Sequence, residues 1–284
     1  MNDLKQKKVD KFVMNLDLSD NGISRALYHN GTRERAFMSI LRNSIKAGDV
    51  CVDLGANIGY TTLFMASKAA SEGQVYAIEP DLHNLEILKS NIELNKFSGT
   101  VTIDQCAISD TDGVIDFWIA RQPNLNSVKK TKHSIRKEEV PCLTLGSYLE
   151  NKRYPNFIKM DVEGHEVKIF EGALQYFAEN KGRTNFLVEV HPHFYDEKND
   201  FAKILREYFN LGFRCKYVVS TPCPRPRKFI EAGYEPLMEV PTDGFVRGLY
   251  GPISNEHLLE FACQENLEGN SKKIVRSFMI GRDE

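Results

Sequence analysis

Two patterns of hydrophobic residues alternate along most of this chain. Short apolar, β-branched runs predict strands, and longer stretches with apolar residues three or four positions apart predict amphipathic helices. The predicted strands span residues 50–54, 75–78, 100–107, 114–119, 157–160, 184–190, 213–219 and 273–280. The predicted helices span residues 31–45, 60–66, 81–95, 144–149, 165–177 and 201–211. This alternation predicts an α/β fold whose parallel strands are joined by right-handed crossovers.

Three segments depart from this pattern. Residues 1–20 show no strong period and are expected to form an arm or a short helix at 9–14. Residues 120–139 read as a long basic loop, either a lid that draws in an anionic acceptor or a solvated loop. The proline-rich stretch after residue 221 leads into a tail that is expected to fold back over the sheet edge.

The length of 284 residues favours one elaborated domain. The 37 basic and 39 acidic residues nearly cancel, so no overall field recruits nucleic acid. The six cysteines show no zinc-type spacing, and the N-terminus has no signal-type apolar core, which predicts a cytoplasmic protein without a membrane span. The expected segments are an N-terminal arm and helix (1–45), a core (46–221) and a C-terminal extension (222–284) that completes the sheet and contributes to the acceptor site.

A glycine loop follows the first buried strand and contains Asp53, Gly55, Asn57 and Gly59. Such a loop directs backbone N–H groups and a helix N-terminus at a ligand. A dinucleotide loop places a glycine where Asn57 stands, and Asp53 would repel a diphosphate but attract an ammonium or sulfonium group. The loop therefore favours S-adenosylmethionine over NAD, with a purely structural turn as the alternative.

Glu79 stands at the end of the next predicted strand. An acidic residue at this point of a parallel sheet can accept hydrogen bonds from both hydroxyls of a ribose. An isolated carboxylate at a strand end is more often simply solvated. Two strand-end acids that flank one helix rarely arise by chance, and together they support a nucleoside-containing ligand.

The glycine loop Asp-x-Gly-Ala-Asn-x-Gly at 53–59 is followed by Ile-Lys-x-Asp-x-Glu-Gly-x-Glu at 158–166. The pair resembles the FkbM family of O-methyltransferases over roughly residues 30–220. The resemblance implies a Rossmann-like class I methyltransferase fold, with a mostly parallel seven-stranded sheet and helices on both faces. It also places Glu34 in a family segment Gly-x-x-Glu, although Glu34 is equally well explained as the cap of a helix.

The activity implied by this resemblance is methyl transfer from S-adenosylmethionine to a hydroxyl of a sugar, glycan or glycan-like small molecule. A polyketide or other natural-product hydroxyl is the alternative acceptor, and a nucleotide-binding oxidoreductase is the alternative from another class. Many methyltransferases have an Asp near the end of the third strand to bind adenine, where this chain has Ala107. The expected cofactor-binding residues are Asp53, Gly55, Asn57, Gly59, Tyr60, Glu79, Ala107 and Asp161.

Acids and imidazoles cluster at the ends of the fourth and fifth strands of the predicted sheet, where ligands of such sheets bind. The candidate catalytic residues are Asp161, Glu163, His165, Glu189 and His191. In one mechanism His165 or His191 removes the acceptor proton, and Asp161 or Glu163 orients the imidazole or the acceptor. In the other, Asp161 and Glu189 hold a divalent cation with His191 or water. The metal-free mechanism is preferred slightly, and Glu163 at a helix start also has a structural explanation.

Overall fold

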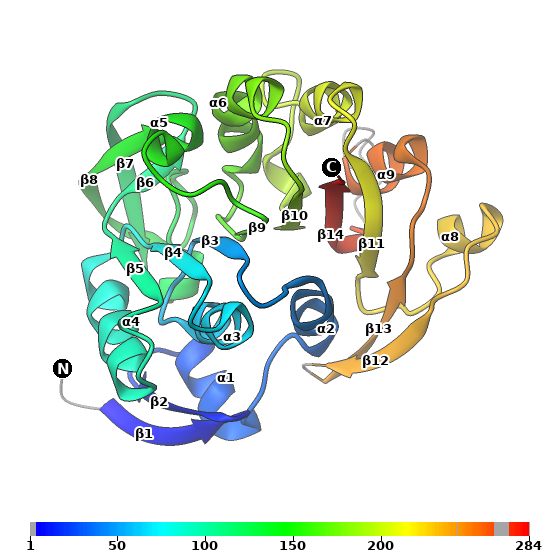
Figure 1. Cartoon of the computed structure of the whole chain (residues 1–284). Coiled ribbons are helices and arrows are strands. Elements are labelled where there is room, and N and C mark those ends of the chain that lie inside the picture. The colour runs from blue at the N-terminus through cyan, green and yellow to red at the C-terminus, as the bar shows by residue number, and fades with distance from the viewer. Residues whose placement is uncertain (1–3, 243, 264–272, 284) are drawn as a thin grey trace.

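A nine-stranded sheet forms the centre of the computed structural model, which describes residues 4–242, 244–263 and 273–283 (Figure 1). The strand order is β12-β13-β11-β14-β10-β9-β3-β4-β5. The strands are β3 (Val50–Leu54), β4 (Gln74–Ile78), β5 (Val101–Asp104), β9 (Phe157–Met160), β10 (Thr184–Glu189), β11 (Arg214–Ser220), β12 (Met238–Thr242), β13 (Phe245–Tyr250) and β14 (Val275–Arg282).

The α/β class is confirmed, but the prediction of seven mostly parallel strands is wrong in number and the sheet is mixed. Strands β5, β4, β3, β9 and β10 are parallel. Strand β14 runs antiparallel between β10 and β11, so the last strand lies inside the sheet rather than at its edge. The hairpin β12–β13 then extends the sheet beyond β11. Neither arrangement follows from local patterning, because both depend on long-range pairing.

Both faces of the sheet are buried because successive strand residues point to opposite sides. Val52 and Ile158 belong to one hydrophobic core, and their neighbours Cys51 and Phe157 belong to the other. The first core is covered by α5 (Leu145–Leu149), α6 (Glu166–Glu179), α7 (Phe201–Asn210) and α9 (Asn255–Ala262). The second is covered by α1 (Ile23–Asn30), α2 (Arg35–Ser44), α3 (Tyr60–Ala69) and α4 (Leu82–Leu94).

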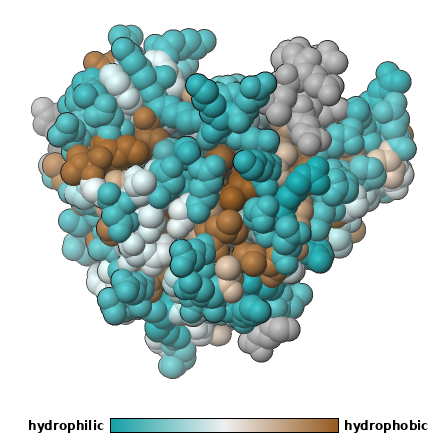
Figure 2. Space-filling model, turned by 90° about the horizontal axis from the view of Figure 1, so that it is seen from above, coloured by the Kyte–Doolittle hydropathy of each residue, from teal (hydrophilic) through white to brown (hydrophobic). Residues whose placement is uncertain are grey.

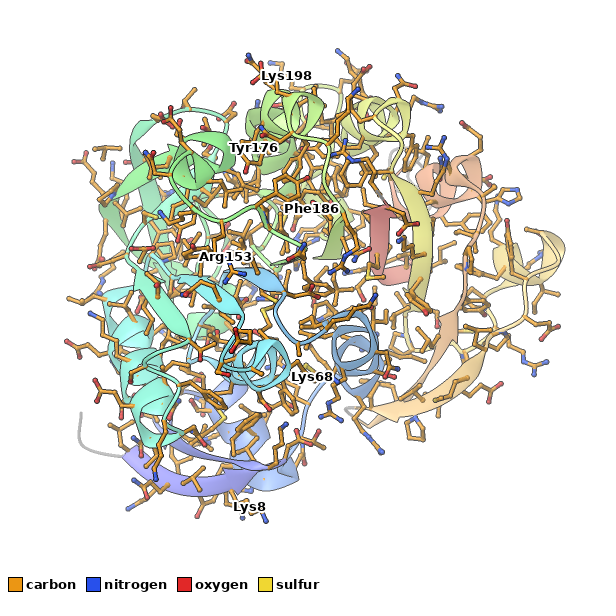
Figure 3. The ribbon with its side chains drawn as sticks, viewed as in Figure 1. Lys8, Lys68, Arg153, Tyr176, Phe186 and Lys198 are labelled. Carbon is orange, nitrogen blue, oxygen red and sulfur yellow. The ribbon has the colours of Figure 1, made fainter. Side chains whose placement is uncertain are left out.

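Helices α2 and α7 are amphipathic, as the sequence pattern predicts, whereas α3 is buried on nearly all sides. Phe186 on β10 lies inside the molecule, whereas Lys8 and Lys198 lie at its periphery (Figure 3). Seen from above the view of Figure 1, the surface is mainly hydrophilic, with hydrophobic patches at its left edge and near its centre (Figure 2). No helix in the described ranges is long and apolar enough to cross a membrane.

The N-terminal segment is a hairpin of β1 (Leu4–Val9) and β2 (Phe12–Asp17), so the prediction of an arm or short helix is wrong. Phe12, Met14 and Leu16 are alternate residues of β2 that point toward the second core. Three such positions make too short a run for the alternation to be recognised in the sequence. Residues 1–3 of this segment, and residues 243, 264–272 and 284 of the predicted C-terminal extension, lie outside the described residues.

A small separate sheet contains β6 (Ala107–Ser109), β7 (Gly113–Ala120) and β8 (Ser134–Thr144). The predicted third strand at 100–107 is thus two strands, because β5 ends at Asp104. The predicted loop at 120–139 is also shorter, since β8 begins at Ser134 and pairs with β7. The remaining elements are η1 (Pro123–Leu125), η2 (Pro192–Phe194) and α8 (Arg227–Glu231).

Candidate active site

A cleft opens at the carboxyl ends of β3, β4, β9 and β10 and, with its open mouth, contains about 1100 Å³ of empty space. It brings together nine of the residues proposed from the sequence, which come from separate loops. These are Gly55, Asn57, Tyr60, Glu79, Ala107, Asp161, Glu163, His165 and Glu189. The three that do not line it are Asp53, Gly59 and His191.

Asp53 is fully buried below the cleft. One of its carboxylate oxygens accepts hydrogen bonds from Thr61 and Thr62, both at 2.7 Å, and the other lies 3.1 Å from Nζ of Lys159. These groups satisfy the charge and hold the start of α3 against β3. The predicted contact between Asp53 and the ammonium group of a ligand is therefore not supported by its position.

Gly55 and Gly59 have left-handed backbone conformations, with φ of 73° and 92°. A Cβ at Gly55 would lie 2.1 Å from the carbonyl oxygen of Asp161, and one at Gly59 would lie 2.6 Å from Cδ1 of Leu88. The first glycine lets the loop after β3 approach the loop after β9. The second lets α3 begin directly against α4.

We expect Gly55→Ala to destabilise the fold by about 2–3 kcal/mol, because it combines left-handed strain with a clash against backbone that cannot move aside. Chemical denaturation measures this change. Gly48→Ala is the matched control, since Gly48 has φ of 84° but no atom within 4 Å of its added Cβ. Equal losses in the two variants would show that the close approach to Asp161 does not matter.

Glu79 lines the cleft at the end of β4 and is held by two backbone N–H groups. Asn57 donates to Oε2 at 2.8 Å and Asp81 donates to Oε1 at 2.9 Å. Burial, aided by the charge of Asp81, raises the pKa of Glu79 to about 7. Each carboxylate oxygen keeps a second lone pair, so the group remains able to accept two further hydrogen bonds.

The wall next to Glu79 is apolar. It contains Ala107 and Ile108 of β6, Phe117 of β7, and Cys106, which precedes β6. Tyr60 lines the cleft near its other end, but its hydroxyl donates to Asp10 at 2.7 Å and so ties the N-terminal hairpin to α3. A flat apolar ring thus has a complementary surface beside Glu79.

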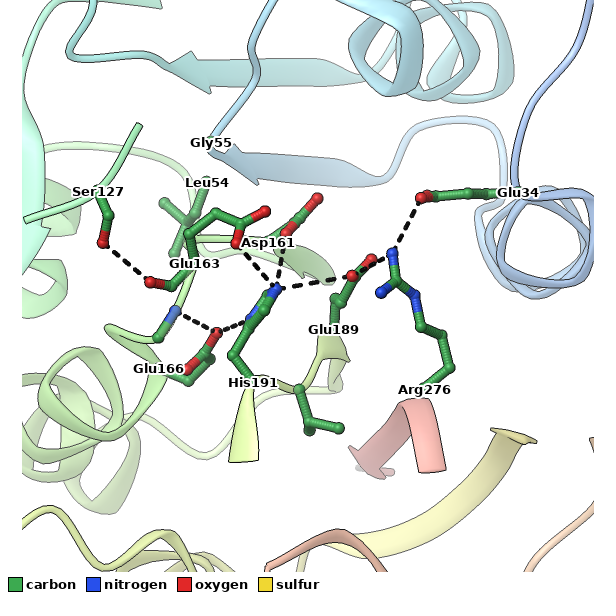
Figure 4. Close-up of polar contacts among 12 residues, drawn as sticks. Glu34, Leu54, Gly55, Ser127, Asp161, Glu163, Glu166, Glu189, His191 and Arg276 are labelled. Atoms are coloured by element: carbon green, nitrogen blue, oxygen red, sulfur yellow. Dashed lines mark hydrogen bonds and ion pairs between the residues drawn. The ribbon is translucent and has the colours of Figure 1, made fainter. Parts of the chain in front are cut away.

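His191 lies under the cleft, 95% buried, at the centre of a carboxylate cluster (Figure 4). Its Nδ1 is 2.6 Å from Oε1 of Glu166, a fully buried carboxylate at the start of α6. Its Nε2 faces the oxygens of Glu163 at 3.4 Å, Glu189 at 3.6 Å and Asp161 at 3.9 Å. The two strand tips predicted to meet therefore do so around one imidazole.

The pKa values of the groups in this cluster are shifted in different directions. Burial lowers the pKa of His191, but the charge and hydrogen bond of Glu166 outweigh it and raise that pKa to about 9. Burial raises the pKa of Glu163 to about 8 and that of Glu189 to about 7. Burial acts on Asp161 in the same direction, but Lys159 and His191 hold its pKa below the usual range. A pKa of about 9 favours the protonated imidazole in the metal-free protein, a form that cannot accept a proton.

His165 lines the cleft on its other side and is neutral, because burial lowers its pKa to about 4. Its Nε2 lies 2.7 Å from the hydroxyl of Ser109, which donates its own proton to Asp110. The imidazole must therefore donate from Nε2, which leaves the lone pair on Nδ1. The pKa values of His165 and His191, which were treated together in the sequence, are thus shifted in opposite directions.

The sequence assigns no role to two residues of the site, Arg276 and Lys159, and leaves two explanations open for Glu34. Arg276 on β14 forms ion pairs with Glu189 and with Glu34, the latter at 3.4 Å. Glu34 precedes α2 without capping it, so its side chain belongs to the cleft. Lys159 belongs to the family motif at 158–166, which is a local signal of its importance. No local signal marks Arg276.

The sheet, the glycine loop and the strand-end carboxylates around one cleft define a Rossmann-like α/β protein of the methyltransferase type. The sequence model of the methyltransferase FkbM domain matches residues 53–215, more than half of the chain. The chain belongs to this family and is a methyltransferase. This membership decides against the oxidoreductase alternative.

Hexuronic acid methyltransferase AglP of Haloferax volcanii is 28% identical to this chain over 183 residues, which are 61% of this chain and 68% of that protein. Among solved structures, methyltransferase FkbM of Methylobacillus flagellatus KT has a TM-score of 0.42 and 16% identity, covering 76% of this chain and 52% of that one. The SAM-dependent O-methyltransferase of Thermotoga maritima has a TM-score of 0.40 and 13% identity, covering 88% and 65%. Nothing about the acceptor follows from these two structures.

Proposed function

We propose that this protein transfers a methyl group from S-adenosylmethionine to a hydroxyl of a sugar or glycan, with a hexuronic acid as the leading acceptor class. Family membership supports methyl transfer, and the likeness to a hexuronic acid methyltransferase supports the acceptor. The observation that carries the proposal is the single cleft where Glu79 and the carboxylates around His191 meet. A natural-product hydroxyl remains the alternative acceptor.

The cleft fits the methyl donor in three places. Glu79 would accept hydrogen bonds from the two ribose hydroxyls, as its free lone pairs allow. The adenine ring would lie against the apolar wall formed by Ala107 and its neighbours. The positive sulfonium would then lie toward Asp161, whose pKa is held low and whose carboxylate is therefore ionised.

Methyl transfer is an in-line displacement, in which the acceptor oxygen forms a bond to the methyl carbon as the carbon–sulfur bond breaks and its electrons go to sulfur. Alignment of the two reactants supplies most of the acceleration. The hydroxyl proton must leave as well, and Glu189 is the group we propose to accept it. Glu189 lines the cleft, and a pKa of about 7 suits proton transfer near neutral pH.

Incubation of the protein with S-adenosylmethionine and candidate acceptors tests the function. The panel should pair each free or nucleotide-linked hexuronic acid with the corresponding neutral hexose, and mass spectrometry should follow a gain of one methyl group. We expect methylation of the uronic acids. Methylation of a natural-product hydroxyl alone would overturn the acceptor assignment, and failure of S-adenosylmethionine to bind folded protein would overturn the whole proposal.

The affinity for S-adenosylmethionine should depend on pH through Glu79. Ribose hydroxyls donate to the ionised carboxylate, so binding favours that form and lowers its pKa from about 7. Affinity should therefore be highest above pH 7 and fall roughly tenfold per pH unit below it, until the pKa of the complex is reached. Calorimetry across this range measures the slope, and a slope retained in Glu79→Gln would assign it to another group.

A further inference from the structure

We propose that Asp161, Glu163 and His191 bind one divalent first-row metal ion, for which Mn²⁺ is a spectroscopic probe, at the floor of the cleft. Metal binding goes beyond the proposed function, because methyl transfer as proposed above does not require a metal ion. It is also measurable without a methyl donor or an acceptor. Its failure and the failure of the proposed function are therefore distinguishable.

The distances among the three residues suit a metal ion better than direct hydrogen bonds. One atom from each lies within 4.8 Å of the others. Nε2 of His191 is 3.4 Å from Glu163 and 3.9 Å from Asp161, beyond the normal hydrogen-bond range. Ligands bound about 2.1 Å from one ion lie roughly 3.0–3.4 Å apart when adjacent, so a small contraction would complete the set.

The orientation of His191 also supports a metal site. The side chain is almost wholly buried, yet Nε2 makes no hydrogen bond among the described residues and is directed at the carboxylates (Figure 4). Glu166 holds Nδ1 at 2.6 Å, which fixes the ring. A carboxylate on the far nitrogen is the usual support of a metal-binding histidine, because it fixes the direction of Nε2. A metal ion bound at Nε2 would release the proton that this nitrogen carries in the metal-free protein.

Asp161 adds an unsatisfied acceptor and a route of entry. Its Oδ1, the atom nearest Nε2, is buried and accepts no hydrogen bond within the described chain. The side chains of Asp161 and Glu163 are 32% and 24% exposed, so the carboxylate side of the cluster opens to the cleft. An ion could therefore enter from the side where the acceptor binds.

The ligand set favours a first-row ion over Mg²⁺ and Ca²⁺. Two carboxylates with one imidazole suit Mn²⁺ better than Mg²⁺ or Ca²⁺, which prefer oxygen ligands alone. Glu189, also close to His191, is engaged by Arg276 and so is not counted among the ligands. A bound ion would polarise an acceptor hydroxyl beside Glu189.

The test is a titration of EDTA-treated, dialysed protein with Mn²⁺, followed by electron paramagnetic resonance and metal analysis. We expect one Mn²⁺ per chain, bound more tightly than Mg²⁺. Asp161→Asn and Glu163→Gln should each weaken binding at least tenfold. Glu256→Gln is the matched control, because this exposed residue lies on α9 and forms a surface ion pair with Arg206.

Thermal melting of each variant accompanies the titration, so that loss of metal is compared only among folded proteins. Should Asp161→Asn fail to fold, Glu163→Gln and Glu163→Ala at the more accessible position carry the comparison. Absence of bound Mn²⁺ at about millimolar concentration, or unchanged binding in the folded variants, would overturn the metal site. His191 would then be a cation that neutralises the carboxylates by itself.

Discussion

Replacing Glu79 by alanine is expected to weaken the binding of S-adenosylmethionine by about 10²–10³-fold. In the proposed complex, the variant removes two hydrogen bonds from ribose hydroxyls to a charged acceptor, each worth about 1.5–3 kcal/mol. Water can replace part of these hydrogen bonds in the variant, so the lost binding free energy should lie near the lower end of the summed range. Isothermal titration calorimetry with the methyl donor and with its demethylated product measures the change directly.

Two further variants separate this contact from damage to the loop. Glu79 also accepts hydrogen bonds from the backbone of Asn57 and Asp81, and Glu79→Gln keeps an oxygen for one of them. It should recover part of the affinity. Glu86→Ala, on the exposed side of α4, is the control for removal of a nearby charge. If Glu79→Ala bound the donor as tightly as the natural protein, the ribose site would have to lie elsewhere.

Replacing Lys159 by methionine is expected to lower the free energy of unfolding by about 3–5 kcal/mol, as when one partner of a buried ion pair is removed. Lys159 and Asp53 are both buried and 3.1 Å apart, and the ammonium also donates to the backbone oxygen of Gly55 at 2.7 Å. The variant leaves the charge of Asp53 uncompensated inside the sheet. Urea denaturation at neutral pH measures the loss.

The double variant Asp53→Asn with Lys159→Met supplies the control. It removes the stranded charge while an amide oxygen remains to accept from Thr61 or Thr62. We expect it to recover at least half of the stability lost in Lys159→Met. A double variant as unstable as the single one would mean that the loss comes from the backbone contacts of Lys159 and not from the ion pair.

Local patterns predicted the core of the fold because each element buries a face with its own period. The strands β3, β4, β9 and β10 and the helices α4 and α5 are confirmed. The N-terminal hairpin and β8 were missed. Their strands are short, or carry many charged residues on an exposed side, so alternation is weak in the sequence.

The candidate site was predictable as a set of residues but not as a set of roles. The rule that ligands bind at the carboxyl ends of parallel strands placed Glu79, Asp161, Glu163 and Glu189 at one edge. Asp53 has the same position in sequence terms, yet Lys159 and two hydroxyls satisfy it below the cleft. Whether a strand-end carboxylate serves a ligand or the fold depends on partners that the sequence does not place beside it.

The sequence by itself determined the α/β class, the family motifs and the edge of the sheet where the chemistry lies, because periodicity and strand ends are local properties. Only the tertiary structure decided which charges face each other. It brought Arg276 from the last strand onto Glu189, and it set His191 among four carboxylates while leaving His165 neutral. Charge state and ligand geometry arise from burial and long-range contact, and those exist only once the chain is folded.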